Sequence, residues 1–349
     1  MKKIRIAVLG LNQGARTARD CVANEEADLV AVAGFGERAE QVAAEVEVPL
    51  YCDYKDLLAN ETLDAIWISL PNQLHEVAVL DALDANIKYI LVDKPIASTV
   101  EEATRMIKAC KEAGATLLIG HHRRSSSKYQ LLKQVLNEGW IGDIVGIQST
   151  YATAKPHEYF NMEWRTTKGG GPLLINAIHD FDDLNYVTGM KPKKVYAAAR
   201  NSVRGNEVED NVSVLVEYEG GVTATYFLSD GTPGPWNYDI LADESDVFCM
   251  CPTENSLRVF GTKGSFGFPS MDLYYYDNSF GYGWDKPLFH KKFGIESNDP
   301  VRNELSHFLD LALGRETTPR CSGEDALDTL KLINSIFKSI ETEAVVEIQ

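Results

Sequence analysis

The sequence predicts two domains: a doubly wound α/β domain, followed by an α+β domain with a large, mainly antiparallel sheet. Three observations lead to this prediction. The chain has 349 residues, which is the length of about two domains of typical size. In residues 1–122, short apolar runs alternate with helical patterns. In residues 123–349, alternating strands joined by turns predominate, so we place the domain boundary after residue 122.

The predicted strands of the first domain are short, unbroken apolar runs. They lie at Ile4–Leu9, Leu29–Ala33, Ala65–Ser69, Tyr89–Val92 and Thr116–Ile119. Such runs are typical of strands that are buried on both faces of a parallel sheet. Between them, segments such as Glu101–Ala113 place apolar residues three or four positions apart, which predicts helices. This order predicts right-handed crossovers and a ligand crevice beyond the carboxyl ends of the strands.

The second domain shows a different pattern, with one helix among the strands and two helices near the end of the chain. Its predicted strands are Ile144–Thr153, Lys194–Ala199, Val212–Tyr218, Val222–Leu228, Tyr238–Ala242 and Ser256–Phe260. Glycine-containing turns at 219–221 and 261–264 predict hairpins. The predicted helices are Pro172–Thr188, Asp299–Leu313 and Gly323–Thr342.

The charge of the chain argues against nucleic acid as a partner. Lys and Arg total 34 against 51 Asp and Glu, which gives a net charge of −17, whereas binding to phosphates requires a basic face. No apolar stretch reaches the ~20 residues that span a bilayer. The N-terminal segment lacks a small-residue cleavage site, so it predicts a strand and not a signal peptide.

The six cysteines are scattered along the sequence. They stand at Cys21, Cys52, Cys110, Cys249, Cys251 and Cys321. They form no pattern of zinc-ligand spacing, with each other or with histidine. We therefore expect no metal site and mostly buried, reduced thiols in a cytoplasmic protein.

A glycine-rich turn follows the first strand and opens a helix. Gly10 and Ala15 fit the first and third positions of the dinucleotide fingerprint GxGxxG/A, whereas Asn12 replaces the middle glycine. Asn is the residue that best tolerates positive φ after glycine. With Gln13, this turn predicts a phosphate-binding helix N-terminus in a Rossmann domain.

The second strand ends without the acidic residue that usually binds the ribose hydroxyls. Gly34 holds that place, and Arg38 follows it closely. Loss of the carboxylate removes repulsion of a 2′-phosphate, and Arg38 could pair with one or be an ordinary surface residue. The sequence therefore predicts NAD or NADP as cofactor and leaves the preference open.

Further motifs stand in an order that is specific in combination. They are Ser69–His75, Val92–Pro95, Gly120–Arg124, Gly169–Pro172, His179–Asp182, Val259–Gly264 and Ser322–Asp325. Together they resemble the glucose-fructose oxidoreductase / inositol dehydrogenase / rhizopine catabolism (Gfo/Idh/MocA) family of NAD(P)-dependent oxidoreductases. The resemblance covers nearly the whole chain.

The resemblance implies two catalytic residues. Lys94 stands at the place of the family's catalytic lysine, with Asp93 in place of the more usual Glu. An ammonium at a strand end can stabilise a developing alkoxide. His179 matches the family's acid/base histidine, and an imidazole suits that proton transfer. The family's Asp four residues earlier is replaced by Ile175, and the neighbouring Asn176 can bind a hydroxyl but cannot act as a base.

The remaining positions follow from the same resemblance. Further cofactor contacts are expected at Leu70, Pro71, Asn72, His75, Asp93, Lys94 and His122. Substrate contacts are expected from segments that carry Arg123, Tyr151, Trp164, Arg165, Asn176 and Trp236, because aromatic faces and Arg forks suit polyhydroxylated molecules.

We therefore predict a dehydrogenase or reductase that transfers a hydride between nicotinamide and a sugar, polyol or cyclitol carbon. A non-catalytic cofactor or sugar sensor of the same fold, and NAD-assisted glycoside cleavage, remain alternatives. Released sugar without net NADH would identify the latter. A one-sided antiparallel sheet usually needs covering, so we expect a homodimer or homotetramer.

Overall fold

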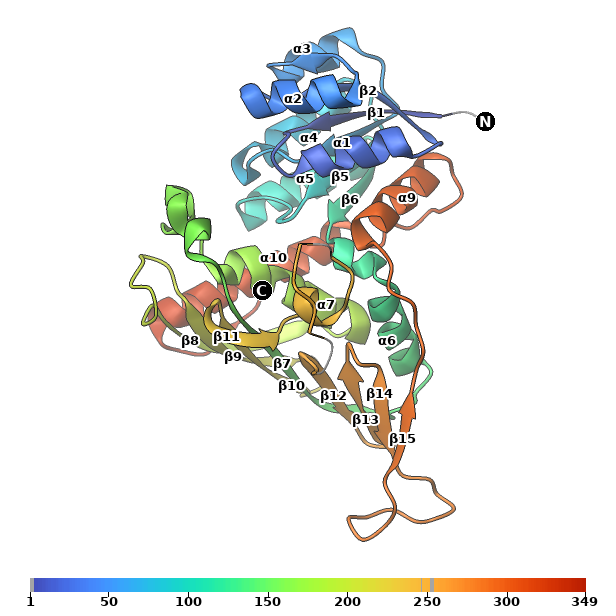
Figure 1. Ribbon diagram of the computed structural model, residues 1–349, viewed down its shortest axis with the longest axis vertical. Helices are drawn as coiled ribbons and strands as arrows, with labels where there is room; N and C mark the ends of the chain where they lie inside the picture. The colour runs from blue at the N-terminus through green and yellow to red at the C-terminus, as the bar shows by residue number, and fades with distance from the viewer. Residues whose placement is uncertain (1–2, 246, 252–253) are drawn as a thin grey trace. The chain divides into compact units, whose positions relative to one another are not determined.

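The computed structural model describes residues 3–245, 247–251 and 254–349, and it divides into two compact units (Figure 1). The first unit runs to Ser125 and includes Pro300–Leu330; the second comprises Ser126–Asp299 and Lys331–Gln349. The sequence placed the boundary after residue 122 and assigned all of residues 123–349 to the second domain. In the structure, a segment late in the chain thus belongs with the first unit.

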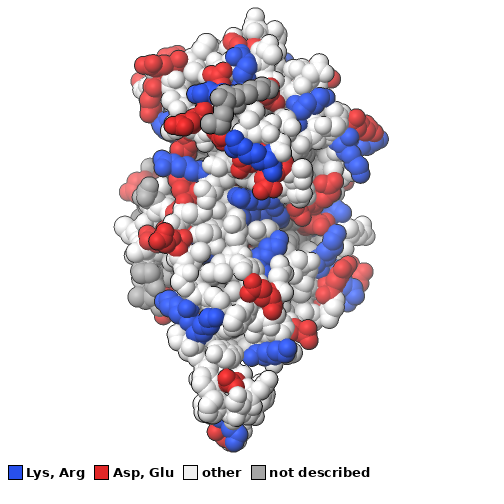
Figure 2. Space-filling model, turned by 90° about the vertical axis from the view of Figure 1, so that its right-hand side faces the viewer, with Lys and Arg blue, Asp and Glu red and all other residues white. Residues whose placement is uncertain are grey.

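The surface carries charges of both signs. On the face that Figure 2 shows, basic and acidic side chains are interspersed and neither forms one continuous field. Among the described residues, no helix has the length and apolar character needed to cross a bilayer.

The first unit is built on a six-stranded parallel sheet. Its strands are β1 (Ile4–Leu9), β2 (Ala27–Ala33), β3 (Leu50–Tyr51), β4 (Ala65–Ile68), β5 (Tyr89–Asp93) and β6 (Thr116–Gly120). Their order is β3-β2-β1-β4-β5-β6, which is the order of a dinucleotide-binding Rossmann sheet. The five strands predicted from apolar runs are confirmed, whereas β3 has only two residues and was missed.

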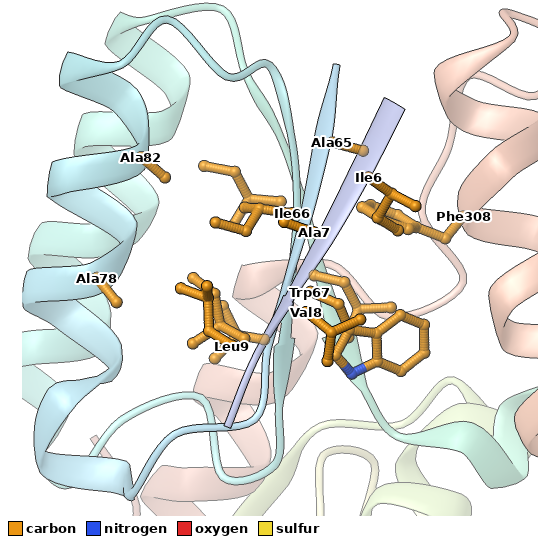
Figure 3. Packing of buried hydrophobic residues seen from close by; sticks show 14 of the residues in the cluster. Ile6, Ala7, Val8, Leu9, Ala65, Ile66, Trp67, Ala78, Ala82 and Phe308 are labelled. Atoms are coloured by element: carbon orange, nitrogen blue, oxygen red, sulfur yellow. The ribbon is translucent and has the colours of Figure 1, made fainter. Parts of the chain in front are cut away.

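Helices cover both faces of this sheet. They are α1 (Gly14–Ala23), α2 (Glu37–Val46), α3 (Tyr54–Asn60), α4 (His75–Asp84), α5 (Val100–Glu112) and α9 (Pro300–Ala312). In Figure 3, Ala78 and Ala82 of α4 face one side of β1 and β4, and Phe308 of α9 faces the other. Trp67 meets Phe308 edge to face, with ring centroids 6.2 Å apart. Helix α9 therefore completes the core of the first unit.

The second unit contains a ten-stranded mixed sheet. Its strands are β7 (Ile144–Ala154), β8 (Pro192–Arg200), β9 (Asn211–Tyr218), β10 (Thr223–Ser229), β11 (Gly231–Trp236), β12 (Leu257–Gly261), β13 (Gly264–Phe268), β14 (Asp272–Tyr275), β15 (Phe289–Lys292) and β16 (Val346–Glu347). The order is β15-β14-β13-β12-β7-β10-β9-β8-β16, with β11 paired to β7. Both predicted hairpins are confirmed, because β9 pairs with β10 and β12 with β13 in antiparallel register. Only the pair of β7 and β10 is parallel among these named strands.

The helices of the second unit lie on one face of the sheet (Figure 1). They are α6 (Ser127–Asn137), α7 (Ile178–Thr188), α8 (Tyr238–Leu241) and most of α10 (Gly323–Thr342). The predicted strand at Tyr238–Ala242 is wrong. Asn237 accepts a hydrogen bond from the Ile240 N–H over 2.8 Å and so caps the short helix α8.

The opposite face of the sheet is open and partly apolar. Along β9, buried and exposed residues alternate, as they do in a strand with one covered face. Tyr196, Leu215 and Phe227 are 43%, 45% and 41% exposed. They line a shallow hollow that extends over β7, β10, β9 and β8.

The cysteines are all free thiols. Cys21, Cys110 and Cys321 are buried, Cys251 is partly buried, and Cys52 and Cys249 are exposed. Burial raises the pKa of Cys21 to about 12 and that of Cys110 to about 11.

Candidate functional site

The turn after β1 passes close to the loop that follows β4. Gly10 has a φ of +87°, and a Cβ atom there would lie 2.3 Å from the carbonyl oxygen of Ser69. A Cβ atom at Gly14, the first residue of α1, would lie 2.7 Å from Cγ1 of Val8. Gly10 thus provides the tight turn, and Gly14 provides the close approach of helix and strand. The sequence assigned the latter role to Ala15 and overlooked Gly14.

The N-terminus of α1 has the form of an anion site. Gln13 is the N-cap residue and makes no side-chain cap, so the first N–H groups of the helix are available to a phosphate. Asn12 is exposed and is not among the residues with positive φ. The sequence suggested that Asn stands here because it tolerates positive φ, but its backbone does not adopt a positive φ in the structure.

A cavity of about 370 Å³ lies beside this turn. It is formed by the segments that follow β1, β2, β3 and β4 and by the first residues of α2 and α3. Its lining residues are Gly10, Leu11, Asn12, Ala33, Gly34, Phe35, Arg38, Ala39, Cys52, Asp53, Tyr54, Ser69, Leu70, Pro71 and Leu74. All of them belong to the first unit, and the cavity lies at the carboxyl edge of the sheet, where the fold binds its ligands.

The loop after β2 and the start of α2 supply an exposed ring and a guanidinium to this cavity. Arg38 donates hydrogen bonds to the carbonyl oxygens of Leu11 (3.3 Å) and Asn12 (3.2 Å), so its charge lies beside the glycine turn. Phe35 is 86% exposed. Gly34 leaves the end of β2 without a carboxylate, whereas Asp53, which follows β3, lines the same cavity. The free helix N-terminus, the cation and the aromatic ring fit the phosphates and the base of a dinucleotide.

A partly buried carboxylate group precedes the predicted catalytic lysine. Asp93 accepts hydrogen bonds from Ser69 Oγ (2.6 Å) and Trp67 Nε1 (3.0 Å). Loss of hydration raises the pKa of Asp93, and these two hydrogen bonds and the charge of Lys94 oppose that rise. The network ties the end of β5 to the end of β4, and so it fixes the backbone from which Lys94 extends.

Two histidines lie near this strand end. His75 is fully buried, and its ring nitrogens lie 2.8 Å from the carbonyl oxygen of Leu70 and 3.0 Å from that of Pro95. It therefore braces two loops of the site, a role that differs from the predicted cofactor contact. Burial and the positive charges of Arg123 and Lys94 lower the pKa of His122 to about 3. A neutral imidazole thus accompanies Lys94.

In the second unit, the segment that carries His179 begins with a π turn. This turn spans Leu173–Ala177 and continues into α7; π turns inside helices are frequent at functional sites. His179 is 7% exposed. Asn176 Oδ1 accepts a hydrogen bond of 2.7 Å from Lys155 Nζ. The amide next to Ile175, which replaces the family's Asp, therefore pairs with a cation.

Lys155 belongs to a charged cluster that the sequence analysis overlooked. It follows β7 directly, and its ammonium lies 3.2 Å from Asp230, which follows β10. Because β7 and β10 are parallel neighbours, their carboxyl ends meet at one edge of the sheet. Arg204 also pairs with Asp230, at 2.5 Å. The sequence shows a lysine close after a long predicted strand. It does not show that β7 pairs with β10, which brings Asp230 close to that lysine.

The predicted substrate residues differ in how far they are exposed to solvent. Trp164 is 49% exposed and Trp236 is 38% exposed, and Arg165 stacks on Tyr159. Tyr151 and Arg123, each 2% exposed, are buried.

The strand order, the glycine turn and the cavity of the first unit are those of a dinucleotide-binding domain. A family model described as "Oxidoreductase family, NAD-binding Rossmann fold" matches residues 4–121, and "GFO/IDH/MocA C-terminal domain" matches residues 129–267. The chain belongs to this Gfo/Idh/MocA family. It is an NAD(P)-dependent enzyme that acts on CH–OH groups.

The chain is similar to several named members. It is 30% identical over 215 residues to a 1,5-anhydro-D-fructose reductase of Ensifer adhaerens, a match that spans 60% of this chain and only 58% of the relative. It is 25% identical over 342 residues to D-xylose 1-dehydrogenase (NADP(+)) 2 of Haloferax volcanii, covering 96% of both. In fold it resembles the crystal structure of scyllo-inositol dehydrogenase from Lactobacillus casei with bound NAD(H) and scyllo-inositol, with a TM-score of 0.79, 19% identity and 99% coverage of each chain.

Proposed function

We propose that the protein transfers a hydride between nicotinamide and a carbinol or carbonyl carbon of a sugar, polyol or cyclitol. The observation that carries the proposal is the position of Lys94. It extends from the end of β5, and Asp93, Ser69 and Trp67 fix the backbone there. The names of the relatives, which include a sugar dehydrogenase and inositol dehydrogenases, support the substrate class.

The cofactor would be held by residues of the first unit. The N–H groups at the start of α1 would bind its phosphates, and Gly10 would permit their close approach. Arg38 and Phe35 lie where its adenosine portion would bind, and Leu70 and Pro71 line the other side of the cavity. When bound, the dinucleotide supplies the nicotinamide carbon that accepts or gives the hydride.

The chain's own residues would manage the oxygen and its proton. In the oxidation, the carbinol carbon loses a hydride and its hydroxyl loses a proton. Lys94 donates a hydrogen bond to that oxygen and stabilises the developing negative charge. His179 takes the hydroxyl proton and passes it to water. Asn176 binds a neighbouring hydroxyl, and its amide cannot compete with His179 as a base.

The replacement of Lys94 tests this assignment. In Lys94→Ala, turnover of a sugar and cyclitol panel should fall by about a hundred- to a thousandfold, because a donor to the developing oxyanion is lost. The dissociation constant of the dinucleotide, measured by calorimetry, should change little. Lys108→Ala removes an exposed lysine of the same unit and should leave both quantities unchanged. Turnover of Lys94→Ala at the wild-type rate would overturn the proposal.

We also propose that the open face of the second unit's sheet is covered by a second copy of the chain. Tyr196, Leu215 and Phe227 are among the exposed apolar residues of that face. Contiguous apolar patches of this kind mark association surfaces, and a dimer or tetramer would bury them.

A further inference from the structure

Arg165, in the second unit, has contacts that fix one side of its guanidinium group. The Arg165 guanidinium carbon lies 3.9 Å from the centre of the Tyr159 ring and 5.3 Å from that of Trp164. Its Nη1 donates a hydrogen bond of 2.9 Å to the carbonyl oxygen of Tyr159. Ring and carbonyl thus fix the plane and one end of the guanidinium.

The opposite edge of Arg165 has no acceptor within the described part of the chain. Its Nε is buried and has no hydrogen-bond partner, and no carboxylate forms an ion pair with Arg165 there. A buried donor without an acceptor is unfavourable, so a native structure that contains one requires a reason. The edge formed by Nε and Nη2 is the fork that binds a carboxylate through two parallel hydrogen bonds.

The charge around Arg165 favours an anion. Lys155 lies 4.7 Å from the centre of the same Tyr159 ring, and its side chain is 10% exposed. Lys155 and Arg204 share the carboxylate of Asp230. Burial lowers the pKa of Lys155, and the charges of Arg204 and Arg165 lower it further, against the opposing effect of Asp230. The cations therefore repel one another.

A second acidic side chain near the cluster does not satisfy this excess. Glu209 accepts a hydrogen bond of 2.9 Å from the Leu173 N–H, and a Cβ atom at Gly171 would lie 2.4 Å from its carboxylate. Its carboxylate is therefore committed to the start of the π turn. Burial raises the pKa of Glu209, and the hydrogen bond from the Leu173 N–H opposes that rise.

We propose that Arg165, supported by Lys155, binds a carboxylate group of the substrate, so that the enzyme acts on sugar acids in preference to neutral sugars. This inference rests on the proposed function, because it names the substrate class of that reaction. A planar carboxylate matches the free planar edge of Arg165. Lys155 also holds Asn176, the amide that precedes His179 by three residues, so the acid-binding cluster and the proposed proton-transfer segment are directly connected.

Calorimetry with the dinucleotide-saturated enzyme tests the inference. The probes are D-gluconate and D-glucuronate, with D-glucose and myo-inositol as neutral partners and D-glucose 6-phosphate as the alternative anion. The wild type should bind at least one sugar acid about tenfold or more tightly than the neutral partners. Arg165→Gln should weaken binding of that acid by about ten- to a hundredfold and leave the neutral partners unchanged.

Two further variants separate the fork from general charge and from misfolding. Arg165→Lys keeps the charge without the planar fork and should recover only part of the affinity. Arg200→Gln removes an exposed arginine of the same unit and should have no effect. Melting curves show whether each variant is folded, and Arg165→Lys carries the test if Arg165→Gln is not.

The possible outcomes distinguish this inference from the proposed function. Equal affinities for acids and neutral sugars, no binding of either acid, or equal losses for both classes in Arg165→Gln would overturn the inference. Tighter binding of the sugar phosphate than of either acid would replace the carboxylate by a phosphate and also overturn it. If the acids bind as expected but no NAD(P)H forms, the proposed function fails and the carboxylate site stands.

Discussion

Replacement of Gly10 by alanine should damage the dinucleotide site through both backbone strain and a steric clash. Gly10 has a φ of +87°, and the new Cβ atom would lie 2.3 Å from the Ser69 carbonyl oxygen and 2.7 Å from its carbon. The left-handed backbone costs about 1–2 kcal/mol for a residue with a Cβ atom. Overpacking against the backbone adds about 1–3 kcal/mol.

Gly36 provides a matched control in the same unit. Its φ is +83°, but a Cβ atom there would meet nothing within 4 Å. Gly36→Ala therefore incurs only the backbone strain of about 1–2 kcal/mol. The difference between the two variants isolates the clash between Gly10 and the loop after β4.

Thermal unfolding and dinucleotide titration provide the measurements. The total loss in Gly10→Ala, about 2–5 kcal/mol, should lower the melting temperature by roughly 4–20 °C, and the loss in Gly36→Ala by roughly 2–8 °C. Gly10→Ala should also lose dinucleotide affinity at a temperature where it is still folded, because the turn must move from the phosphate position. Equal melting temperatures and wild-type affinity in both variants would refute the reasoning.

Three further predictions concern the cofactor preference, the pKa of Asp93 and association through the open sheet face of the second unit. Arg38→Ala should raise the dissociation constant of NADP by about ten- to a hundredfold and that of NAD much less, because a 2′-phosphate contact is lost. Calorimetry checks this, with Arg19→Ala as a control that lies outside the cavity; equal losses for NAD and NADP would contradict it. The pKa of Asp93 is raised in the folded state. As the pH rises above the unfolded value of about 3.9, Asp93 therefore loses its proton in the unfolded state first. The free energy of unfolding falls until the pH passes the pKa of the folded state. Asp93→Asn should therefore gain melting temperature relative to the wild type between acidic and neutral pH, and a relative loss would show that the sign is wrong. Leu215→Glu and Phe227→Glu place charge on the open sheet face and should reduce the mass measured by sedimentation, whereas an unchanged mass would mean that this face is not an interface.

Local patterns predicted the first unit well. Each apolar run there is long enough to identify a buried strand, and the glycine turn after β1 carries its own signature. Strand β3 has two residues, too few to show a period. Helix α9 was predicted as an element, but its packing on Trp67 depends on contacts between residues far apart in the sequence.

The second unit shows where sequence patterns no longer suffice. The segment at Tyr238–Ala242 has strand-like composition, yet the Asn237 side chain competes for the backbone N–H groups and caps a helix instead. Lys155 and Asp230 meet only because β7 and β10 are parallel neighbours. Nothing near either residue in the sequence indicates the other.

The sequence pointed to those residues of the candidate site that belong to a local motif. Gly10, Gly34 and Arg38 were identified from one turn and one strand end, and all three line the cavity. His75 was predicted as a cofactor contact, but its burial and its two carbonyl partners indicate a bracing role. Gly14 escaped notice because its importance lies in the distance to Val8.

The transfer of an isotopic label tests the central claim most directly. Sugars, their glycosides, sugar acids and cyclitols that carry deuterium on the carbinol carbon would be incubated with the enzyme and oxidised dinucleotide, and the products analysed by mass spectrometry. Direct hydride transfer predicts that deuterium appears on the nicotinamide ring in step with the oxidised product. Label that returns to the released sugar with no net reduced dinucleotide would instead show glycoside cleavage through transient oxidation, and label that stays in unreacted substrate across the panel would contradict hydride transfer.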